Sequence, residues 1–499
     1  MTSIVLLALS LSLSAPARYD GHAIVRVWVD DHAELSWLRS HSEELLQERP
    51  GPGFVDARVT DAQRRALAAA GVSYELRRED LQHDIDAERA RLAAARTPVA
   101  GAWFDDFRDY DSIMAELDRI AADAPTLARV VELGSSLEGR PIRALRLSHA
   151  PEGAKAVLFT GTMHAREWLA TMVSMCVADA FATGDGVDDD VTDLLASVEV
   201  WVVPVLNPDG YVISWTDDRY WRKNARDGYG VDLNRNWDYQ WAVVGASDNP
   251  YDEDYHGPFA FSEPETVALR DFIVARPQIV AHIDFHSYSQ LVLRPWGYTY
   301  AAPSDEATLA QLGEQMSDAM WGATSTDYAS IHAAELYPAA GAVDDWSYGD
   351  RGIMAFTIEL RGDDFVVPPS QIAPACAESV AAARALATWV RQQVPPDPGG
   401  QADGSDGADG HEGDPTASDE GTGAGTTDDT AIDDTAGQDD DAHDGGVADP
   451  DDGALPPGFG QDGARTGGCA CVSATPLAAG DAAPLLVLTA FARRRRYGT

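Results

Sequence analysis

An alternation of apolar strands with amphipathic helices runs from Trp103 to Gln393 and constrains the fold more than any other feature of the sequence. Short runs such as AKAVLFTGTM and VEVWVVPVLN alternate with longer segments whose apolar residues recur at helical spacing, such as EATLAQLGEQMSDAMW. Strands this apolar are buried on both faces, so helices must cover both sides of the sheet. The sequence therefore predicts an α/β domain over residues 100–394, with a mixed central β-sheet and active-site loops at the carboxyl ends of its strands.

The predicted elements of this domain alternate regularly along the chain. The strand candidates cover residues 142–148, 154–163, 198–207, 279–287, 290–298 and 353–360, and the helix candidates cover residues 171–183, 264–275, 306–321 and 379–393. Four cysteines are too few for a disulfide scaffold in a chain of 499 residues. Cys176 and Cys376 fall on helices of this domain, and nothing in the sequence decides whether they pair.

A smaller α+β unit precedes this domain at residues 18–96. Its predicted elements are strands at 23–29, 53–60 and 72–78, helices at 33–47 and 61–71, and a long helix at 80–96. We expect a ferredoxin-like unit with a modest core. The long helix carries several arginines and ends at TPVAG, so it predicts an exposed connector that proteases can cut.

Both ends of the chain carry segments outside these two units. Residues 1–17 have the form of a secretory signal peptide without a positive n-region, although a disordered apolar leader would look similar. Residues 395–466 are rich in Asp, Gly, Ala and Thr and predict a disordered acidic stalk, either a solvated spacer or a weak cation sink. Residues 467–499 combine Cys469, Cys471, an apolar stretch and an Arg cluster. They resemble the sorting tails of bacterial surface proteins, and the alternative is an unstructured basic end.

The charge balance and the two ends limit the partners and the location. The formal net charge is −44, but 19 acidic residues lie in residues 397–452, which contain no Lys or Arg. The remainder is still acidic, which argues against nucleic acid as a partner. We expect export to the extracellular side or to a bacterial cell surface, anchored at the outer membrane through a tail that engages export or sorting machinery.

Two strand ends carry metal-ligand candidates. GTMHAREWLA, residues 161–170, follows an apolar strand and places His164 and Glu167 three residues apart, a spacing that can bring an imidazole and a carboxylate to one ion. AHIDFHSYSQ adds His286 at the end of another strand and His282 within it. A histidine inside a strand is more often part of the core, so we favour His286 as the third ligand. Two His and one carboxylate leave the open position that a catalytic zinc requires.

Zinc hydrolysis also needs a general base and a cation for the developing oxyanion. FTIELRG places Glu359 at the end of a third strand, where the alternative is an ordinary surface carboxylate. In a chain this acidic, the arginines of DRYWRKNARDGYGVDLNRNWD suggest a bound anion, because Arg binds carboxylates bidentately. The polar residues of this segment are Arg219, Arg222, Arg226, Asn234 and Arg235.

Seven motifs, HAREW, NPDGY, WRKNAR, DLNRNWD, HSYSQ, LYPAAGAVDDW and FTIELR, resemble in this order the zinc metallocarboxypeptidases of the carboxypeptidase A/B family. The resemblance covers residues 103–393, and residues 19–96 resemble that family's activation domain. It implies the zymogen of an exopeptidase that holds one Zn²⁺ per chain and hydrolyses the C-terminal bond of peptides. A trypsin-like protease would activate it near Arg89 to Arg96, and we expect a monomer.

The resemblance also implies a role for each matching residue. One group performs the chemistry: the zinc ligands His164, Glu167 and His286, the general base Glu359, the oxyanion residue Arg222, and Asp232, which would orient His164. A second group would bind the peptide: Asn234, Arg235 and Tyr337 on its C-terminal carboxylate, and Arg166 and Tyr288 in the outer subsites.

The neighbours Asp344 and Asp345 in GAVDDW bear on the terminal residue that is removed. In the family, the position of Asp344 lies at the floor of the pocket for the terminal side chain, where Asp goes with Lys and Arg and an aliphatic residue goes with aromatic and aliphatic termini. Asp345 matches an acidic residue of both subtypes, so the resemblance implies a carboxypeptidase B-like preference. Two departures from the B-type pattern, His332 and Gly297, flank this pocket, and His332 would narrow it or pair with Asp344.

Two other functions stay open from the sequence. One is the same chemistry on aromatic or aliphatic termini, if His332 neutralises Asp344. The other is a non-catalytic surface protein that binds peptide termini. A binding protein would need neither Glu359 nor a complete ligand set, whereas both are present in this chain.

Overall fold

The computed structural model describes residues 15–47, 52–94 and 103–394 of the chain. Most of the predicted leader, residues 48–51, Arg96, and all of the predicted stalk and tail lie outside the described residues. Within the described ranges, no helix combines the length and the apolar character needed to cross a membrane.

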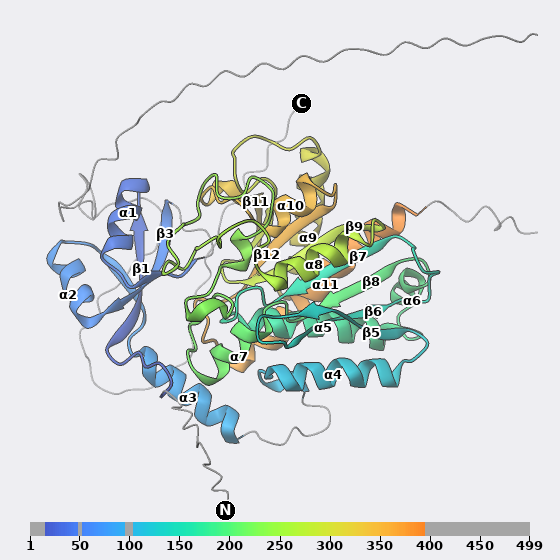
Figure 1. The fold of residues 1–499 in the computed structure, drawn as a ribbon, viewed down its shortest axis with the longest axis horizontal. Helices are drawn as coiled ribbons and strands as arrows, with labels where there is room; N and C mark the ends of the chain where they lie inside the picture. Colours follow the sequence, from blue (N-terminus) through green and yellow to red (C-terminus); the bar gives the residue numbers. More distant parts are fainter. Residues whose placement is uncertain (1–14, 48–51, 95–102, 395–499) are drawn as a thin grey trace, which may run out of the picture.

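The larger domain is built on an eight-stranded sheet with the order β11-β10-β12-β9-β7-β8-β6-β5 (Figure 1). The strands are β5 (Ala128–Ser135), β6 (Pro141–Leu147), β7 (Ala156–Gly161), β8 (Glu199–Val203), β9 (Ile279–Ser287), β10 (Leu291–Arg294), β11 (Ala329–His332) and β12 (Met354–Leu360). The four central strands β12, β9, β7 and β8 run parallel, whereas β10 joins β12, and β6 joins β8, in antiparallel pairs. The predicted mixed sheet is therefore confirmed.

Helices cover both faces of this sheet, as predicted. Along β7, Val157 and Phe159 pack into one hydrophobic cluster and Leu158 packs into the other, because successive side chains of a strand point to opposite faces. The first cluster contains residues of α4 (Tyr110–Asp123), α5 (Trp168–Gly184), α6 (Asp189–Leu195), α9 (Glu306–Thr324) and α11 (Ile372–Gln392). The second contains residues of α8 (Pro264–Val274) and α10 (Val343–Gly349). The remaining helix, α7 (Pro208–Thr216), begins with a proline in its first turn.

The predicted elements recur in the structure with two kinds of difference. β8 ends at Val203, four residues before the predicted end, because Pro204 has no N–H for the strand ladder. α11 begins at Ile372 rather than at 379, and Pro374 is tolerated because it lies in the first turn, where an N–H has no helical partner. The edge strands β5 and β11 were not among the predicted strands.

The N-terminal unit is a four-stranded antiparallel sheet with the order β2-β3-β1-β4. Its elements are β1 (His22–Val29), α1 (His32–Ser40), β2 (Glu44–Leu45), β3 (Gly53–Thr60), α2 (Asp61–Ala69), β4 (Tyr74–Arg78) and the long α3 (Leu81–Ala94). α1 and α2 pack on one face, where Val25, Val27 and Val59 meet Leu38 and Leu67.

One predicted helix of this unit is wrong in its length. Residues 33–47 were expected to be one helix, but α1 ends at Ser40 and Glu44–Leu45 form an edge strand beside β3. The hydroxyl groups of Ser40 and Ser42 donate to the carbonyls of Trp37 and Leu38 at 2.8 and 2.9 Å, and such side-chain bonds to the backbone compete with helix continuation.

The opposite face of the small sheet lies against the larger domain (Figure 1). A shared hydrophobic cluster joins the two units; its members include Tyr19, Ile24, Leu46, Leu81 and Ile85 from the N-terminal unit and Tyr220, Tyr288, Phe365 and Val366 from the larger domain. This contact places the edge strand β2 close to the carboxyl ends of the parallel strands, where the candidate site lies.

Candidate active site

Three buried side chains meet at the carboxyl ends of two neighbouring strands. His164 and Glu167 lie between β7 and α5, and His286 lies near the end of β9, which pairs with β7. His164 Nδ1 is 3.0 Å from Glu167 Oε1 and 3.0 Å from His286 Nδ1, and His286 Nδ1 is 3.1 Å from Glu167 Oε2. All ligand atoms lie within 4.8 Å of one another, so one metal ion could contact all three residues.

Each imidazole is held from behind by a carboxylate. His164 Nε2 lies 3.1 Å from Asp232 Oδ1, and His286 Nε2 lies 2.7 Å from Asp284 Oδ2. Each carboxylate accepts a hydrogen bond from an Nε2–H group, which leaves the Nδ1 lone pairs directed at the common point. Two imidazole nitrogens and one carboxylate are the donor set of catalytic zinc sites, so the residues present fit a zinc ion.

The competing histidine, His282, lies outside this group. It shares a strand face with His286 but sits four residues earlier, where its Nε2 meets Thr160 Oγ1 at 2.8 Å and its Nδ1 meets Ser347 Oγ at 3.3 Å. Burial lowers the pKa of His282 to about 4, which keeps the ring neutral in the core.

Glu359 lies beside the three-residue cluster. It is the penultimate residue of β12, is 1% exposed, and stands directly opposite His286 in the parallel pairing of β12 with β9. Thr357 shares its strand face, and the Thr357 hydroxyl is buried without a hydrogen-bond partner among the described residues. Thr357 was not among the predicted site residues, although its i+2 spacing from Glu359 on one strand could have indicated it.

Asp232 links the histidine cluster to an arginine. Its Oδ2 accepts a 2.8 Å hydrogen bond from Arg222 Nη2, and its Oδ1 faces His164 and accepts from the backbone N–H of Asn234 at 2.9 Å. Burial opposes ionisation of Asp232, but Arg222, Arg235 and His164 lower its pKa strongly. One fully buried carboxylate therefore positions both an imidazole and a guanidinium.

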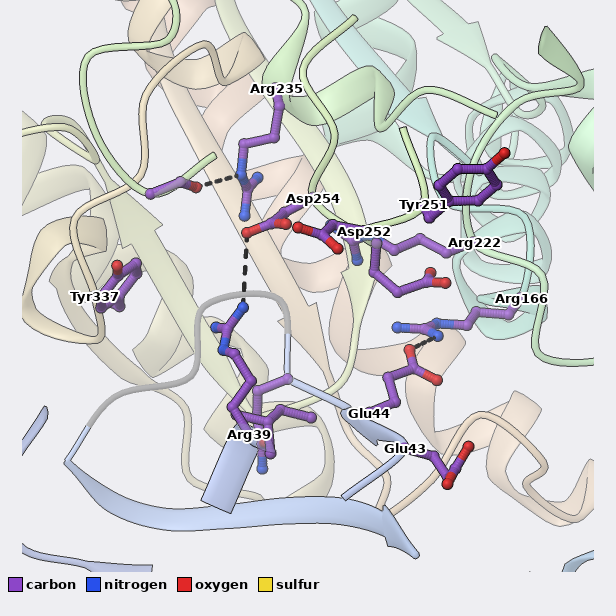
Figure 2. Close-up of a pocket in the computed structure, with 14 residues that line it drawn as sticks. Arg39, Glu43, Glu44, Arg166, Arg222, Arg235, Tyr251, Asp252, Asp254 and Tyr337 are labelled. Carbon is purple, nitrogen blue, oxygen red and sulfur yellow. Dashed lines mark hydrogen bonds and ion pairs between the residues drawn. The ribbon is translucent and has the colours of Figure 1, made fainter. Parts of the chain in front are cut away.

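The predicted arginine cluster divides in the structure. Arg222 and Arg235 line a cavity of about 330 Å³ together with Arg166 and Tyr337 (Figure 2). Arg235 donates from Nε to Gly245 O at 3.1 Å. Arg219 and Arg226 point elsewhere, because their guanidinium groups bind Glu88 and Glu263, each at 2.7 Å.

Asn234 connects this cavity to the helix that carries the aspartate pair. Its Oδ1 accepts from the backbone N–H of Val343 at 3.0 Å, at the first residue of α10. Asp344 and Asp345 follow, both at most 1% exposed. Asp345 accepts from the backbone N–H groups of Gly297 and Tyr298 at 2.8 and 3.0 Å, so Gly297 contributes through its backbone.

His332 lies next to Glu306, a carboxylate that the sequence did not indicate. The sequence left open that it would pair with Asp344, but its Nε2 lies 3.0 Å from Glu306 Oε2 on α9. Glu306 also accepts from Arg294 Nη2 at 3.1 Å. Neither Arg294 nor Glu306 was singled out in the sequence, because they precede the pocket motif by about 40 residues or more.

Three residues of the N-terminal unit, two of them carboxylates, contact predicted substrate residues. Glu44 of β2 forms a buried ion pair with Arg166, and Asp56 of β3 accepts a 3.0 Å hydrogen bond from the Tyr288 hydroxyl. Figure 2 shows Glu44 against the Arg166 guanidinium inside the cavity. The ring of His32 lies 5.9 Å from that of Tyr337. The N-terminal unit therefore occupies the side from which a peptide would approach these residues.

Asp284 is the other residue that sequence reasoning missed. It stands two residues before His286 on the same strand face, and its second oxygen accepts from Thr160 Oγ1 at 2.5 Å. The motif IDFH contained this information, because side chains at i and i+2 of a strand point the same way.

Comparison with known proteins agrees with this geometry. Residues 113–382 match the family model described as zinc carboxypeptidase. The chain is 38% identical over 297 residues to carboxypeptidase B of Astacus astacus, covering 57% of this chain and 97% of that one. It is 33% identical over 383 residues to carboxypeptidase A2 of Mus musculus, covering 74% and 90%. The crystal structure of carboxypeptidase A from Helicoverpa armigera superposes with a TM-score of 0.68 at 28% identity, covering 75% of this chain and 98% of that one.

Proposed function

Because the chain belongs to the zinc carboxypeptidase family and is therefore a metallopeptidase of the exopeptidase type, we propose that it is an exported zymogen that removes C-terminal Lys and Arg from peptides. The observation that carries the preference is the buried Asp344, next to an Asp345 whose carboxylate binds two backbone N–H groups. A buried carboxylate at a substrate pocket favours a cationic side chain, which offsets the cost of burying its charge.

His164, Glu167 and His286 would hold the zinc ion. Bound zinc supplies a Lewis acid that polarises the scissile carbonyl and acidifies water. Asp232 and Asp284 keep the two imidazoles oriented, because each accepts from the Nε2 of one ring.

Glu359 would act as the general base and then as the general acid. In our proposal its carboxylate takes a proton from the attacking water and returns it to the nitrogen of the leaving amino acid as the C–N bond breaks. Its place opposite His286 on the neighbouring strand supports this role, because water between them would lie within reach of both. Arg222, held by Asp232 through Nε and Nη2, would donate to the oxyanion of the tetrahedral intermediate.

Asn234, Arg235 and Tyr337 would bind the free carboxylate of the substrate. A guanidinium group can bind both oxygens of a carboxylate. The guanidinium of Arg235 donates to the backbone carbonyls of Gly245 and Asn234, and these hydrogen bonds hold it in place. Binding of the free terminus restricts the enzyme to the last peptide bond. Arg166 and Tyr288 would contact residues on the other side of that bond.

The contacts of the N-terminal unit support a zymogen. Its carboxylates Glu44 and Asp56 bind Arg166 and Tyr288, so a peptide could not reach these residues in the intact chain. The connecting helix α3 is held by a buried ion pair of Glu88 with Arg219 at 2.7 Å. In our proposal a trypsin-like protease cuts this connector at or after Arg89, and release of the unit opens the site to peptides.

The proposal of export rests on the leader and tail sequences, which lie mostly outside the described residues. The disulfide between Cys176 and Cys376 is consistent with an oxidising compartment. We propose that the mature monomer acts outside the cell or at a bacterial outer surface.

The proposal is tested with the purified chain after cleavage by a trypsin-like protease. Matched peptides ending in Arg, Lys, Phe or Leu are compared by kcat/KM, with and without a zinc chelator. We expect release of Arg and Lys with a preference of more than about tenfold, loss of activity with the chelator, and reversal of the preference in Asp344→Ile. Glu359→Gln should lower kcat by about 10²–10⁴-fold while the protein keeps its zinc.

Two outcomes would redirect the proposal. A preference of the wild-type enzyme for Phe or Leu would indicate a carboxypeptidase A-like pocket despite Asp344. No release from any peptide by a processed, zinc-loaded protein would favour a peptide-binding function instead.

A further inference from the structure

Arg294 and His332 lie side by side near the proposed pocket for the terminal residue. Arg294 ends β10 and His332 ends β11, and the two residues are paired in the parallel register of these strands. Both reach the same carboxylate on α9: Glu306 Oε1 lies 3.1 Å from Arg294 Nη2, and Oε2 lies 3.0 Å from His332 Nε2. The side chains of Arg294 and His332 are only 11% and 17% exposed, so water screens a charge there poorly.

The start of α9 is bound directly to the helix that carries Asp344. Tyr348 lies one turn after Asp344 on α10, and the Tyr348 hydroxyl donates to Asp305 Oδ2 at 2.8 Å and accepts from the Asp305 N–H at 3.0 Å. Asp305 immediately precedes Glu306. Residues four apart share a helix face, so the Tyr348 hydroxyl joins the start of α9 to the face of α10 that carries Asp344. We refer to these joined segments as the wall.

The residues that follow Arg294 also contact this wall. The carbonyl of Trp296 accepts from the Ala334 N–H at 3.0 Å, two residues after His332. The next N–H, that of Gly297, donates to Asp345 at 2.8 Å. Trp296 also packs against Tyr348, with ring centroids 5.0 Å apart. The segments that carry Arg294 and His332 are therefore in direct contact with the segment that carries Asp344 and Asp345.

A positive charge in this wall would oppose the binding of a cationic side chain next to Asp344. Arg294 is always charged. Glu306 supplies a negative charge that offsets the charge of Arg294, and its two carboxylate oxygens contact both Arg294 and His332.

We propose that Glu306 is a specificity-determining positioning residue: by binding Arg294 and His332 together it keeps the wall from repelling the Lys or Arg terminus of a substrate. This inference rests on the proposed preference for basic termini. It also gives His332, which departs from the B-type pattern, a place compatible with that preference.

The test is Glu306→Gln in the full chain after protease activation, with peptides ending in Arg, Lys and Leu. We expect KM for the Arg and Lys peptides to rise by about three- to tenfold, with kcat for all peptides and KM for the Leu peptide unchanged, because only the cationic terminus senses the added charge. Glu306→Asp should restore most of the affinity. The double variant Glu306→Gln/Arg294→Gln should recover part of it, because the positive charge that Glu306 offsets is gone.

Glu314→Gln, at an exposed position of the same helix, is the matched control and should leave all constants unchanged. An equal change of KM or kcat for all three peptides in Glu306→Gln would reduce Glu306 to a structural residue and overturn the inference, and so would no change at all. If Glu306→Gln does not fold, Arg294→Gln decides the matter: with Glu306 kept and the positive charge removed, the Arg-over-Leu ratio of kcat/KM should rise, and an unchanged ratio would overturn the inference. Failure of the proposed function is distinguishable, because it appears as a preference of the wild-type enzyme for Leu.

Discussion

The two imidazoles of the metal cluster are oriented by carboxylates from different parts of the chain. Asp232 lies in the segment that also carries Arg222, whereas Asp284 stands on the same strand as His286. Such partners fix which nitrogen carries the proton and which nitrogen faces the metal. The quality of the metal site therefore depends on residues that never touch the ion.

Replacing Asp284 by Asn should weaken zinc binding. The amide oxygen of Asn would be a poorer acceptor for the His286 Nε2 proton than the carboxylate is, so we expect the zinc affinity to fall by about 10–100-fold. Titration of the protein against a metal-binding dye measures this change. Asp209→Asn is the control: Asp209 is equally buried but binds Ser136 and Arg140, and zinc affinity should not change there. Unchanged zinc affinity in Asp284→Asn would show that the ring keeps its orientation without the charge.

At the scale of elements, the two-residue strand β2 has an effect out of proportion to its length. β2 places the Glu44 carboxylate in contact with Arg166, and Arg58 of β3 binds the same carboxylate at 3.2 Å. Burial opposes ionisation of Glu44, but the charges of Arg166 and Arg58 lower its pKa below the ordinary value. The helix predicted for this segment would have turned successive side chains around an axis, whereas the edge strand directs Glu44 into the cavity (Figure 2).

Glu44→Gln should weaken the contact between the N-terminal unit and the larger domain. Removing one partner of a buried ion pair leaves an uncompensated charge, at a cost of about 3–5 kcal/mol. We expect the uncleaved chain to show higher peptidase activity and faster activation by trypsin. The neighbouring Glu43→Gln removes an exposed carboxylate of the same cavity and should have little effect. Equal latency of the two variants would mean that the apolar contact alone holds the unit in place.

The disulfide joins two helices on one side of the sheet. Cys176 lies on α5 and Cys376 lies on α11, 200 residues apart in sequence. A cross-link that closes so long a loop restricts the unfolded chain, and its removal costs about 2–5 kcal/mol. We expect Cys176→Ser/Cys376→Ser to lower the free energy of unfolding by this amount in denaturant titrations. The variant Cys469→Ser/Cys471→Ser should leave that free energy unchanged, and an equal loss in both would contradict the expectation.

For the whole molecule, the contact between the two units combines apolar packing with buried charges. Asp364, in the loop after β12, is 1% exposed and accepts from the Tyr220 hydroxyl and the Phe365 N–H, each at 2.6 Å. Arg78 of β4 lies 3.4 Å from its other oxygen. Burial raises the pKa of Asp364 to about 6, although Tyr220 and Arg78 act in the opposite direction.

This shift predicts a pH dependence of stability. A raised carboxyl pKa means that the folded state binds the proton more tightly than the unfolded state does. The stability contributed by this proton is therefore complete below the ordinary carboxyl pKa of about 4 and is lost as pH rises through about 6. We expect the free energy of unfolding of the wild type, relative to Asp364→Asn, to decrease between these pH values in denaturant titrations. The same comparison with Glu314→Gln should be nearly independent of pH, and a flat difference for Asp364→Asn would contradict the assignment.

Local patterns along the chain were sufficient for much of this molecule. Strand and helix periodicity predicted the six main strands and the helices on both faces, because burial of alternating or helically spaced residues depends on near neighbours. Motif order indicated the zinc carboxypeptidase family, and the strand ends at His164, His286 and Glu359 indicated where its site would form. These inferences needed only short stretches and the rule that parallel strands end at one edge of a sheet.

Pairings across long sequence separations could not be predicted in the same way. Glu44 and Arg166 are 122 residues apart, the two bridged cysteines are 200 apart, and His332 binds Glu306 instead of Asp344. Each partner is one of many similar residues, and a choice among them requires the positions of whole elements in space. Short-range periodicity is encoded in the free energy of neighbouring residues, whereas these contacts exist only after burial in the fold has brought distant charges and thiols within a few ångströms.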